Sequence, residues 1–315
     1  EHISYEEACR LAIDALLDSG VVTEEMVVPS YEEALRSIQK RQATEAKGMK
    51  ESWYDTTKPD TPIWSILHEE LKAKIGKEGA STIHRESNKV VGFLADPNVK
   101  DLKRKGLVVG YVQSGKTANF SAVIAKAVDE GYRFVIVLAG MYNNLRRQTQ
   151  ERLDNDVLSA CDGHKSVKAL TDVTGDISWK PIQWGFKNKN DVFFAVVKKN
   201  SRRLENLLHK LEVANKEGLL DNVPVLIIDD ESDQATPNTA KEDEEYSSIN
   251  RLLRQIWDQV STGSYVAYTA TPFANVLMNP DDEERYTEHV KSSNSDNPEG
   301  EDIERYPGLY PSDFI

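Results

Sequence analysis

The stretch GYVQSGKT, residues 110–117, has the residue types and the spacing of a phosphate-binding loop. A glycine is followed by four residues and then by Gly-Lys-Thr, between a short apolar run and a segment with helical spacing. Glycines let consecutive backbone N–H groups approach phosphate oxygens, and the following helix adds the positive end of its dipole. We expect Lys116 to reach the β- and γ-phosphates of ATP and Thr117 to ligate Mg²⁺. The residues predicted to bind the nucleotide are Gly110, Gln113, Ser114, Gly115, Lys116 and Thr117.

A cluster of acids ends the apolar run VLIIDDESD, residues 225–233. An acid at the carboxyl end of a buried strand can hold the metal of a bound nucleotide when the same sheet carries a phosphate loop. We therefore expect Asp230 to contact Mg²⁺ and Glu231 to orient and polarise the attacking water. Two alternatives stay open. In the first, the strand is one residue shorter and Asp229 contacts the metal. In the second, the acids have no catalytic role and only lie at the N-terminus of a helix, where acidic residues are common.

Small hydroxyl side chains end a third apolar run, YVAYTATPFANVL, residues 265–277. Thr269 and Thr271 leave the end of a strand, where they can hydrogen-bond the acids and sense the γ-phosphate. Taken alone, this run also fits an ordinary strand-to-loop turn ended by Pro272. The residues predicted to act in catalysis are Lys116, Glu231, Thr269 and Thr271.

These motifs need a sheet that brings strand ends together, and the remaining sequence predicts one. From about residue 104 onward, short apolar runs alternate with helical segments. Near-continuous apolar strands in such an alternation predict an α/β fold, a parallel sheet with helices on both faces. Residues 155–190 interrupt the alternation and read as an insertion. The expected strands are 107–109, 134–139, 192–197, 225–229 and 265–269, and the expected helices lie near 116–130, 143–153, 202–217 and 247–260.

The two ends of the chain differ from this central part. The first 90 residues read as an α-helical N-terminal module without catalytic residue types; Thr61 and Pro62 suit a helix start, and Gly76 suits a stop. The last residues are polar and acidic, and they predict a flexible tail. The predicted parts are a helical module over 1–90, a nucleotide-binding domain over 91–280, and an acidic tail or linker over 281–315.

The composition narrows the class of protein. The 315 residues carry a formal net charge of −13, so any contact with a nucleic-acid backbone must be local. Two cysteines far apart in the sequence predict no disulfide framework and a reducing, cytoplasmic setting. Because no apolar run approaches about 18 residues, we expect no contact with a membrane interior.

In this order, the three motifs resemble the motor core of superfamily 2 helicases and translocases. The resemblance implies a RecA-like P-loop NTPase sheet in which the 265–269 strand lies between the other two motif strands. The segments VLAGMYNNLRRQTQERL (137–153) and VVKKNSRRLENLL (196–208) resemble motifs that face bound nucleic acid in that family. The implied phosphate contacts are Asn143, Arg146, Arg147, Lys198, Lys199, Asn200 and Arg203; each also fits a solvated helix face.

Beyond the three motifs, the sequence over residues 85–280 resembles bacterial Z-one domain proteins, which are often labelled endonucleases. This resemblance implies a motor that uses ATP and Mg²⁺ and acts on DNA, with RNA not excluded. It also implies partners from restriction-modification or other phage-defence systems. Superfamily 2 motors use two RecA-like lobes, and residues 281–315 are too few for another lobe. We therefore expect the first half of a motor, weak in hydrolysis without its second lobe.

Three other functions stay open at this point. An ATP-gated switch that assembles partners would use the same motifs without translocation. A phosphotransferase would need an acceptor pocket and a lid, and it leaves the Thr-Ala-Thr-Pro motif without a role. The endonuclease label requires a nuclease centre, and the sequence has no convincing Asp…Glu-x-Lys pattern.

Overall fold

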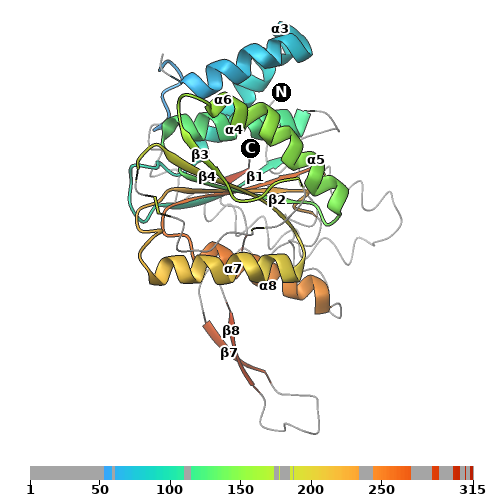
Figure 1. The fold of residues 1–315 in the computed structure, drawn as a ribbon. Coiled ribbons are helices and arrows are strands. Elements are labelled where there is room, and N and C mark those ends of the chain that lie inside the picture. The colour runs from blue at the N-terminus through green and yellow to red at the C-terminus, as the bar shows by residue number, and fades with distance from the viewer. Residues whose placement is uncertain are drawn as a thin grey trace, which may run out of the picture.

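A computed structural model of the chain describes residues 53–58, 61–109, 115–173, 177, 185–186, 188–233, 244–270, 286–290, 301–305, 309 and 313–314. A central sheet crosses the molecule between two layers of helices (Figure 1). None of the helices within these ranges is long and apolar enough to cross a membrane.

The central sheet has seven strands, and every neighbouring pair runs parallel. The strands are β1 (Lys103–Val109), β2 (Phe134–Ala139), β3 (Ser166–Ala169), β4 (Asp191–Lys198), β5 (Val225–Asp230), β6 (Gly263–Thr269) and β9 (Asp313–Phe314). Their order across the sheet is β3-β4-β2-β5-β6-β1-β9. All five expected strands are present, and β3 adds a strand inside the segment that reads as an insertion.

Helices cover both faces of this sheet. They are α3 (Pro62–Phe93), α4 (Gly115–Glu130), α5 (Asn143–Leu153), α6 (Ser159–Cys161), α7 (Ser201–Lys216) and α8 (Glu244–Asp258), with a π-helical turn at Asp154–Leu158 before α6. Helices α3 to α6 lie on one side of the sheet, and α7 and α8 lie on the other (Figure 1). The predicted α/β fold, a parallel sheet with helices on both faces, is confirmed.

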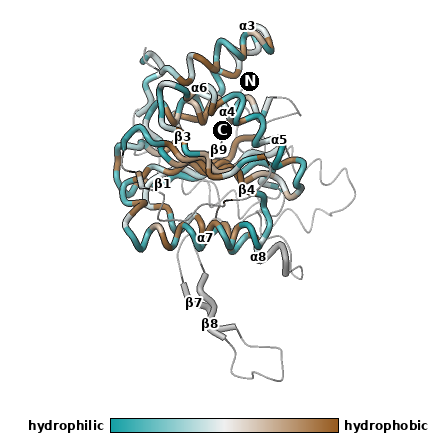
Figure 2. The backbone as a smooth tube through the Cα atoms, in the orientation of Figure 1, coloured by the Kyte–Doolittle hydropathy of each residue, from teal (hydrophilic) through white to brown (hydrophobic). Residues whose placement is uncertain are grey.

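Apolar side chains fill the two interfaces between sheet and helices. All six residues of β2 are buried, as expected for a central strand that is covered on both faces. Helix α7 turns Leu204, Leu207 and Leu211 inward at helical spacing. Figure 2 shows the hydrophobic residues gathered along the central strands. This double cover explains why the strands read as short, unbroken apolar runs.

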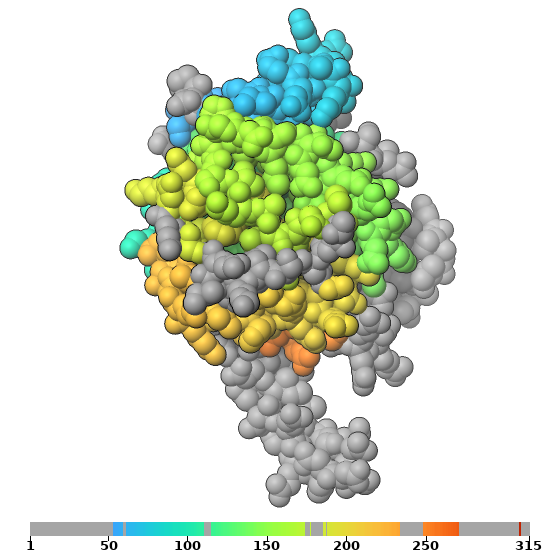
Figure 3. Space-filling model, viewed as in Figure 1, coloured from blue at the N-terminus to red at the C-terminus, as the bar shows by residue number. Residues whose placement is uncertain are grey.

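Helix α3 belongs to the same packed unit as the sheet. It is interrupted at Gly76, where φ is +78° and a stop is predicted, but it then resumes. Its Ile63 and Leu67 lie in one apolar cluster with Phe120 of α4, and the helix projects from one end of the molecule in Figure 3. Residues 1–52 lie outside the described ranges, so the helical module over 1–90 and its boundary stay a prediction.

Polar groups of α4 fix the start of α3. The carboxylate of Asp129 accepts the backbone N–H groups of Ile63, at 3.2 Å, and Trp64, at 2.9 Å. These are N–H groups of the first helical turn, which have no partner within their own helix. Burial raises the pKa of Asp129 to about 6. A side chain distant in sequence thus takes the place of a local N-cap.

Lys126 of α4 is fully buried in the same interface. Its Nζ donates to the carbonyl of His84 at 3.0 Å, to Ser87 Oγ at 2.6 Å and to Asn88 Oδ1 at 2.6 Å. The same Nζ lies 4.1 Å from the ring centroid of Trp64. Burial lowers the pKa of Lys126 to about 7. The amine is therefore held by dipoles and an aromatic face instead of a carboxylate.

Replacing Lys126 with methionine is expected to flatten the dependence of stability on pH above neutrality. Between the folded pKa of about 7 and the ordinary value of 10.5, the unfolded chain binds more protons than the folded chain. The free energy of unfolding of the wild type should therefore rise with pH in this window. Urea unfolding at several pH values measures the rise, and Lys77→Met on the exposed side of α3 is the matched control. Equal slopes for the wild type and Lys126→Met would contradict the prediction.

Strands also lie in the segment that composition predicts to be a flexible tail. Strands β7 (Tyr286–Val290) and β8 (Glu301–Arg305) pair antiparallel in a sheet of their own. Strand β9 pairs with β1 at Gly106 and Leu107, and Leu309 lies in the apolar core. Strand β9 thus lies beside the strand that precedes the predicted phosphate loop.

Candidate nucleotide-binding site

The strand order brings the three sequence motifs to one edge of the sheet. Strand β6 lies between β5 and β1, with Tyr268 paired to Asp230 and Thr269 paired to Val109. Because all the strands are parallel, their carboxyl ends meet at the same edge, where open α/β sheets bind ligands. The predicted placement of the 265–269 strand between the other two motif strands is confirmed.

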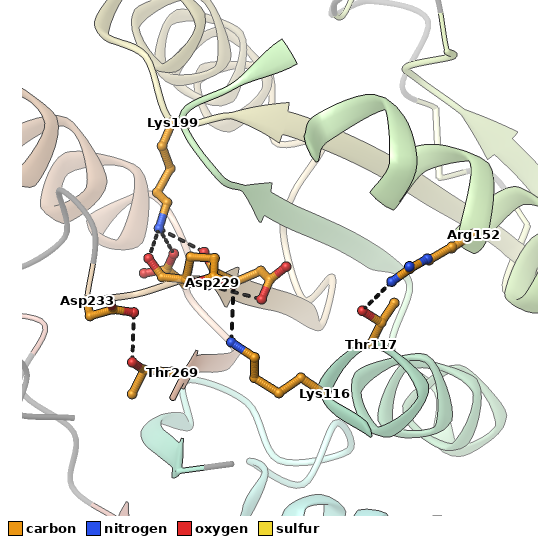
Figure 4. A network of polar contacts seen from close by, with 9 residues as sticks. Lys116, Thr117, Arg152, Lys199, Asp229, Asp233 and Thr269 are labelled. Atoms are coloured by element: carbon orange, nitrogen blue, oxygen red, sulfur yellow. Dashed lines mark hydrogen bonds and ion pairs between the residues drawn. The ribbon is translucent and has the colours of Figure 1, made fainter. Parts of the chain in front are cut away.

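Lys116 reaches across this edge to the acidic cluster. It is the second residue of α4, and its Nζ lies 3.2 Å from Glu231 Oε1 (Figure 4). The side chain of Lys116 is 13% exposed and that of Glu231 is 33% exposed, so both can be approached from solvent. The predicted nucleotide contacts Gly110, Gln113 and Ser114 lie outside the described residues and stay predictions.

Asp230 and Glu231 follow each other at the end of β5, and the turn between them is unusual. Glu231 has a φ of +53°, in the left-handed region that costs a residue with a side chain about 1–2 kcal/mol. Its N–H donates to Asp230 Oδ1 at 3.0 Å. Burial raises the pKa of Asp230, and the neighbouring Glu231 carboxylate raises it further. Two acids are thus held side by side where a bound cation would relieve their repulsion.

Strand β6 adds two contacts to the edge. Thr269 Oγ1 donates to Asp233 Oδ1 at 2.7 Å (Figure 4), and Tyr268 Oη donates to Asn119 Oδ1 of α4 at 2.9 Å. The first joins the third motif to the last acid of the second, and the second joins β6 to the helix that carries Lys116. Thr271, the other predicted hydroxyl, lies outside the described residues.

Arg152 is a member of this edge that the sequence does not reveal. It lies in the last turn of α5, and its Nη1 donates to Thr117 Oγ1 at 2.9 Å (Figure 4). Thr117 is the predicted magnesium ligand, so Arg152 brings a second positive charge beside Lys116. The contact depends on how the end of α5 and the π-helical turn after it lie against α4, and no local pattern in the sequence predicts it.

The residues implied as phosphate contacts separate into a set that is exposed or half-buried and a set that is buried. Lys198 Nζ donates to Asn143 Oδ1 at 3.0 Å, and Arg147 forms an i,i+4 pair with Glu151 at 2.8 Å. Arg203 is exposed on the first turn of α7, which follows Asn200. These side chains stay in the predicted set.

Arg146 and Lys199 are used inside the fold, which removes them from that set. Arg146 Nη2 donates to the carbonyls of Asp172 and Val173, each at 3.0 Å. Lys199 is fully buried and pairs with the equally buried Asp229 at 2.9 Å. A backbone phosphate outside the fold cannot replace these partners, and both cations therefore act within the structure. The pairing of Asp229 also leaves Asp230 as the candidate metal ligand.

The groups at this edge fit a nucleotide with magnesium. Lys116 and the first N–H groups of α4 suit phosphate oxygens, and a β-carbon added to Gly115 would meet no described atom within 4 Å other than those of its chain neighbours and its own helix backbone. Among the described residues, no three His, Cys, Asp or Glu side chains group to hold a metal. Mg²⁺ in phosphate sites takes one or two carboxylates and completes its shell with phosphates and water. Thr117 and Asp230 are the side chains that would hold it here.

Comparisons with known proteins find similarity to solved structures only. No family model and no curated protein matches the chain. One similar solved structure is Mss116p, lacking its NTE and C-tail, bound to single-stranded RNA and AMP-PNP, with 14% identity and a TM-score of 0.35. Another is the DEAD-box helicase Mss116 bound to single-stranded RNA and UDP-BeF, with 16% identity and a TM-score of 0.33. The alignments cover 72% and 70% of this chain but 44% of either Mss116 chain, so the chain spans less than half their length.

Proposed function

We propose that this chain is the ATP-binding and ATP-hydrolysing first motor domain of a superfamily 2 helicase- or translocase-like protein. The observation that carries the proposal is the 3.2 Å contact between Lys116 Nζ and Glu231 Oε1. It joins the start of the helix after the phosphate loop to the acids at the end of β5. One triphosphate can therefore touch both motifs at once.

The roles of the residues follow from their charge and position. Lys116 would neutralise the β- and γ-phosphates, and Glu231 would accept a hydrogen bond from the attacking water and so orient it. Mg²⁺, held by Thr117 and Asp230, would neutralise charge on the phosphates. Thr269 would keep Asp233 in place through its 2.7 Å hydrogen bond. Catalysis of this kind depends on positioning and on charge neutralisation.

The pair between Lys116 and Glu231 has a further role in this proposal. A triphosphate that binds Lys116 takes the ammonium away from the Glu231 carboxylate. The carboxylate then loses its cation and is free to accept a hydrogen bond from water. Binding of the substrate would thus prepare the group that acts on it.

The partners that we propose are a nucleic acid and a second RecA-like lobe. We further propose DNA as the nucleic acid and a role in restriction or phage defence; this part rests on the resemblance of the sequence to Z-one domain proteins alone, since no family model matches the chain. RNA is the competing ligand.

Hydrolysis of ATP by the complete protein, with and without nucleic acid, tests the proposal. Single-stranded DNA, double-stranded DNA and single-stranded RNA are added separately in the presence of Mg²⁺. We expect turnover to rise with one of them. No hydrolysis under any condition would overturn the proposal. Stimulation by a protein partner alone would favour an assembly switch, and DNA cleavage without ATP that is lost in Asp230→Ala would favour a nuclease.

Changing Arg147, Lys198 and Arg203 together to alanine is expected to weaken nucleic-acid binding and reduce its salt dependence. Each exposed cation that contacts a phosphate contributes about 0.7 to the slope of log K against log salt for single strands, so the slope should fall by about 2. Fluorescence anisotropy at several salt concentrations measures both quantities. The matched control changes three exposed or half-exposed cations of α3: Lys72, Arg85 and Lys89. An unchanged slope would contradict the proposal that nucleic acid binds along these three residues.

A further inference from the structure

Lys199 lies directly behind the acids of the candidate site, at the end of β4. Its side chain is 0% exposed. Its Nζ donates to Asp229 Oδ1 at 2.9 Å, to the carbonyl of Asp230 at 2.8 Å and to the carbonyl of Glu231 at 2.7 Å (Figure 4). An ammonium has three N–H donors, and these three acceptors use all of them.

Asp229 supplies the charge that allows an ammonium to be buried here. Its second oxygen, Oδ2, accepts the hydroxyl of Tyr265 at 2.7 Å. Burial raises the pKa of that hydroxyl well above its usual range, so Tyr265 keeps its proton and stays a donor. Asp229 is thus fully engaged with Lys199 and Tyr265. Because side chains alternate along a strand, it points to the face opposite that of Asp230.

Two of the three Lys199 contacts go to backbone instead of to charge. They fix the carbonyls of Asp230 and Glu231, which belong to the peptide groups before and after the left-handed residue Glu231. On the far side of the turn, the N–H of Ser232 donates to the carbonyl of Tyr268 at 3.0 Å. A backbone in a sparsely populated region persists only where its surroundings determine it. Here the Lys199 side chain and strand β6 hold the backbone on either side of Glu231.

Lys199 also belongs to the segment that faces the proposed nucleic-acid path. Its backbone N–H donates to the carbonyl of Ala139 at 3.2 Å and extends the pairing of β4 with β2. Lys198, its neighbour, turns outward to Asn143. Asn200, on the other side, precedes α7, whose first turn carries Arg203. Two adjacent side chains therefore contact the two sites: Lys198 lies on the proposed nucleic-acid path, and Lys199 contacts the buried turn at Asp230 and Glu231.

We propose that Lys199 is a positioning residue that holds the turn carrying Glu231 and so links nucleic acid bound along residues 198–203 to ATP hydrolysis. The inference rests on the proposed function. A displacement of the backbone at Lys198 or Asn200 moves the anchor of Lys199, and the Glu231 carboxylate moves with it. A shift of about 1 Å in such a group can cost about 10²-fold in rate.

The test separates this role from simple charge pairing. A variant with Lys199→Met alone leaves the Asp229 charge buried without a partner, so loss of activity would not be informative. The informative variant combines Lys199→Met, Asp229→Leu and Tyr265→Phe. It removes both charges and the hydroxyl together, and apolar replacement of a whole buried pair is often neutral for stability. It does not restore the hydrogen bonds to the two carbonyls.

For this triple variant of the complete protein we expect a cooperative melting transition, at a lower temperature than in the wild type because two carbonyls lose their hydrogen bonds, and an ATP affinity close to that of the wild type. We expect kcat in the presence of nucleic acid to fall about 10- to 100-fold, with KM for ATP little changed. The pair Lys199→Gln with Asp229→Asn is a second variant. Both replacement side chains are uncharged, but the glutamine keeps two amide N–H groups that can donate to the two carbonyls. The kcat of this variant should therefore lie between those of the triple variant and the wild type.

The outcomes distinguish the two proposals. If a folded triple variant, or the polar pair where the triple variant does not fold, is stimulated by nucleic acid like the wild type, the role of Lys199 is overturned and the proposed function stands. If the wild type itself hydrolyses no ATP, the proposed function is overturned, and this inference falls with it.

Discussion

The Lys116→Ala variant is expected to bind ATP at least about 10²-fold more weakly than the wild type. Hydrogen bonds to charged groups contribute about 1.5–3 kcal/mol, which corresponds to roughly 10- to 150-fold in affinity. The loss should reach the upper end because the negative charge of Glu231 beside the triphosphate is then no longer balanced by an ammonium. Titration of the chain with a fluorescent ATP analogue in the presence of Mg²⁺ measures the change.

The control for this variant is Lys216→Ala. Lys216 is the last residue of α7, which leads away from the acidic edge toward the opposite end of the sheet. The same change of charge there should leave the affinity as it is. Retention of wild-type affinity in Lys116→Ala would show that the loop before α4 does not bind a triphosphate in the way proposed.

The second large effect is expected for Glu231→Gln in the complete protein. The amide keeps the size of the side chain but cannot act as a general base, and this contribution is typically about 10²- to 10⁴-fold in rate. ATP should bind as tightly as in the wild type or more tightly, because one negative charge beside the phosphates is gone. Steady-state turnover and a separate binding titration measure the two quantities.

Glu217→Gln, at the far end of α7, is the matched control and should turn over like the wild type. If Glu231→Gln keeps the wild-type rate, another group orients the water, and Asp233 is the next candidate at this edge. If Glu231→Gln loses binding as well, the carboxylate has a structural role in the turn and not the catalytic role proposed here.

Much of the fold can be predicted from sequence because its elements obey local rules. The strands β2, β4 and β5 are short apolar runs, since both faces of the sheet are covered. Helices α4 and α7 end beside Gly131 and Gly218, whose φ values of +117° and +68° favour glycine. The strand order could be predicted only because the three motifs resemble a known arrangement.

Whether an individual basic side chain is buried or exposed could not be predicted in the same way. Arg146 and Arg147 are neighbours in one helix, yet the first is buried against backbone carbonyls and the second is exposed. Lys198 and Lys199 differ in the same manner at the end of β4. Which of two adjacent cations faces inward depends on the packing of a segment distant in sequence, here residues 172–173 and the end of β5.

The joint between α3 and α4 has a mechanical consequence. Helix α4 carries Lys116 at its first turn, and Asp129, which caps α3, near its last. The two residues are separated by roughly 20 Å of continuous helix, at 1.5 Å per residue. An α-helix of this length is stiff, so a protein bound to α3 would displace the same helix whose other end carries Lys116, the residue that we propose contacts the phosphates. A force applied to α3 would then reach the proposed nucleotide site through α4 and not through the sheet.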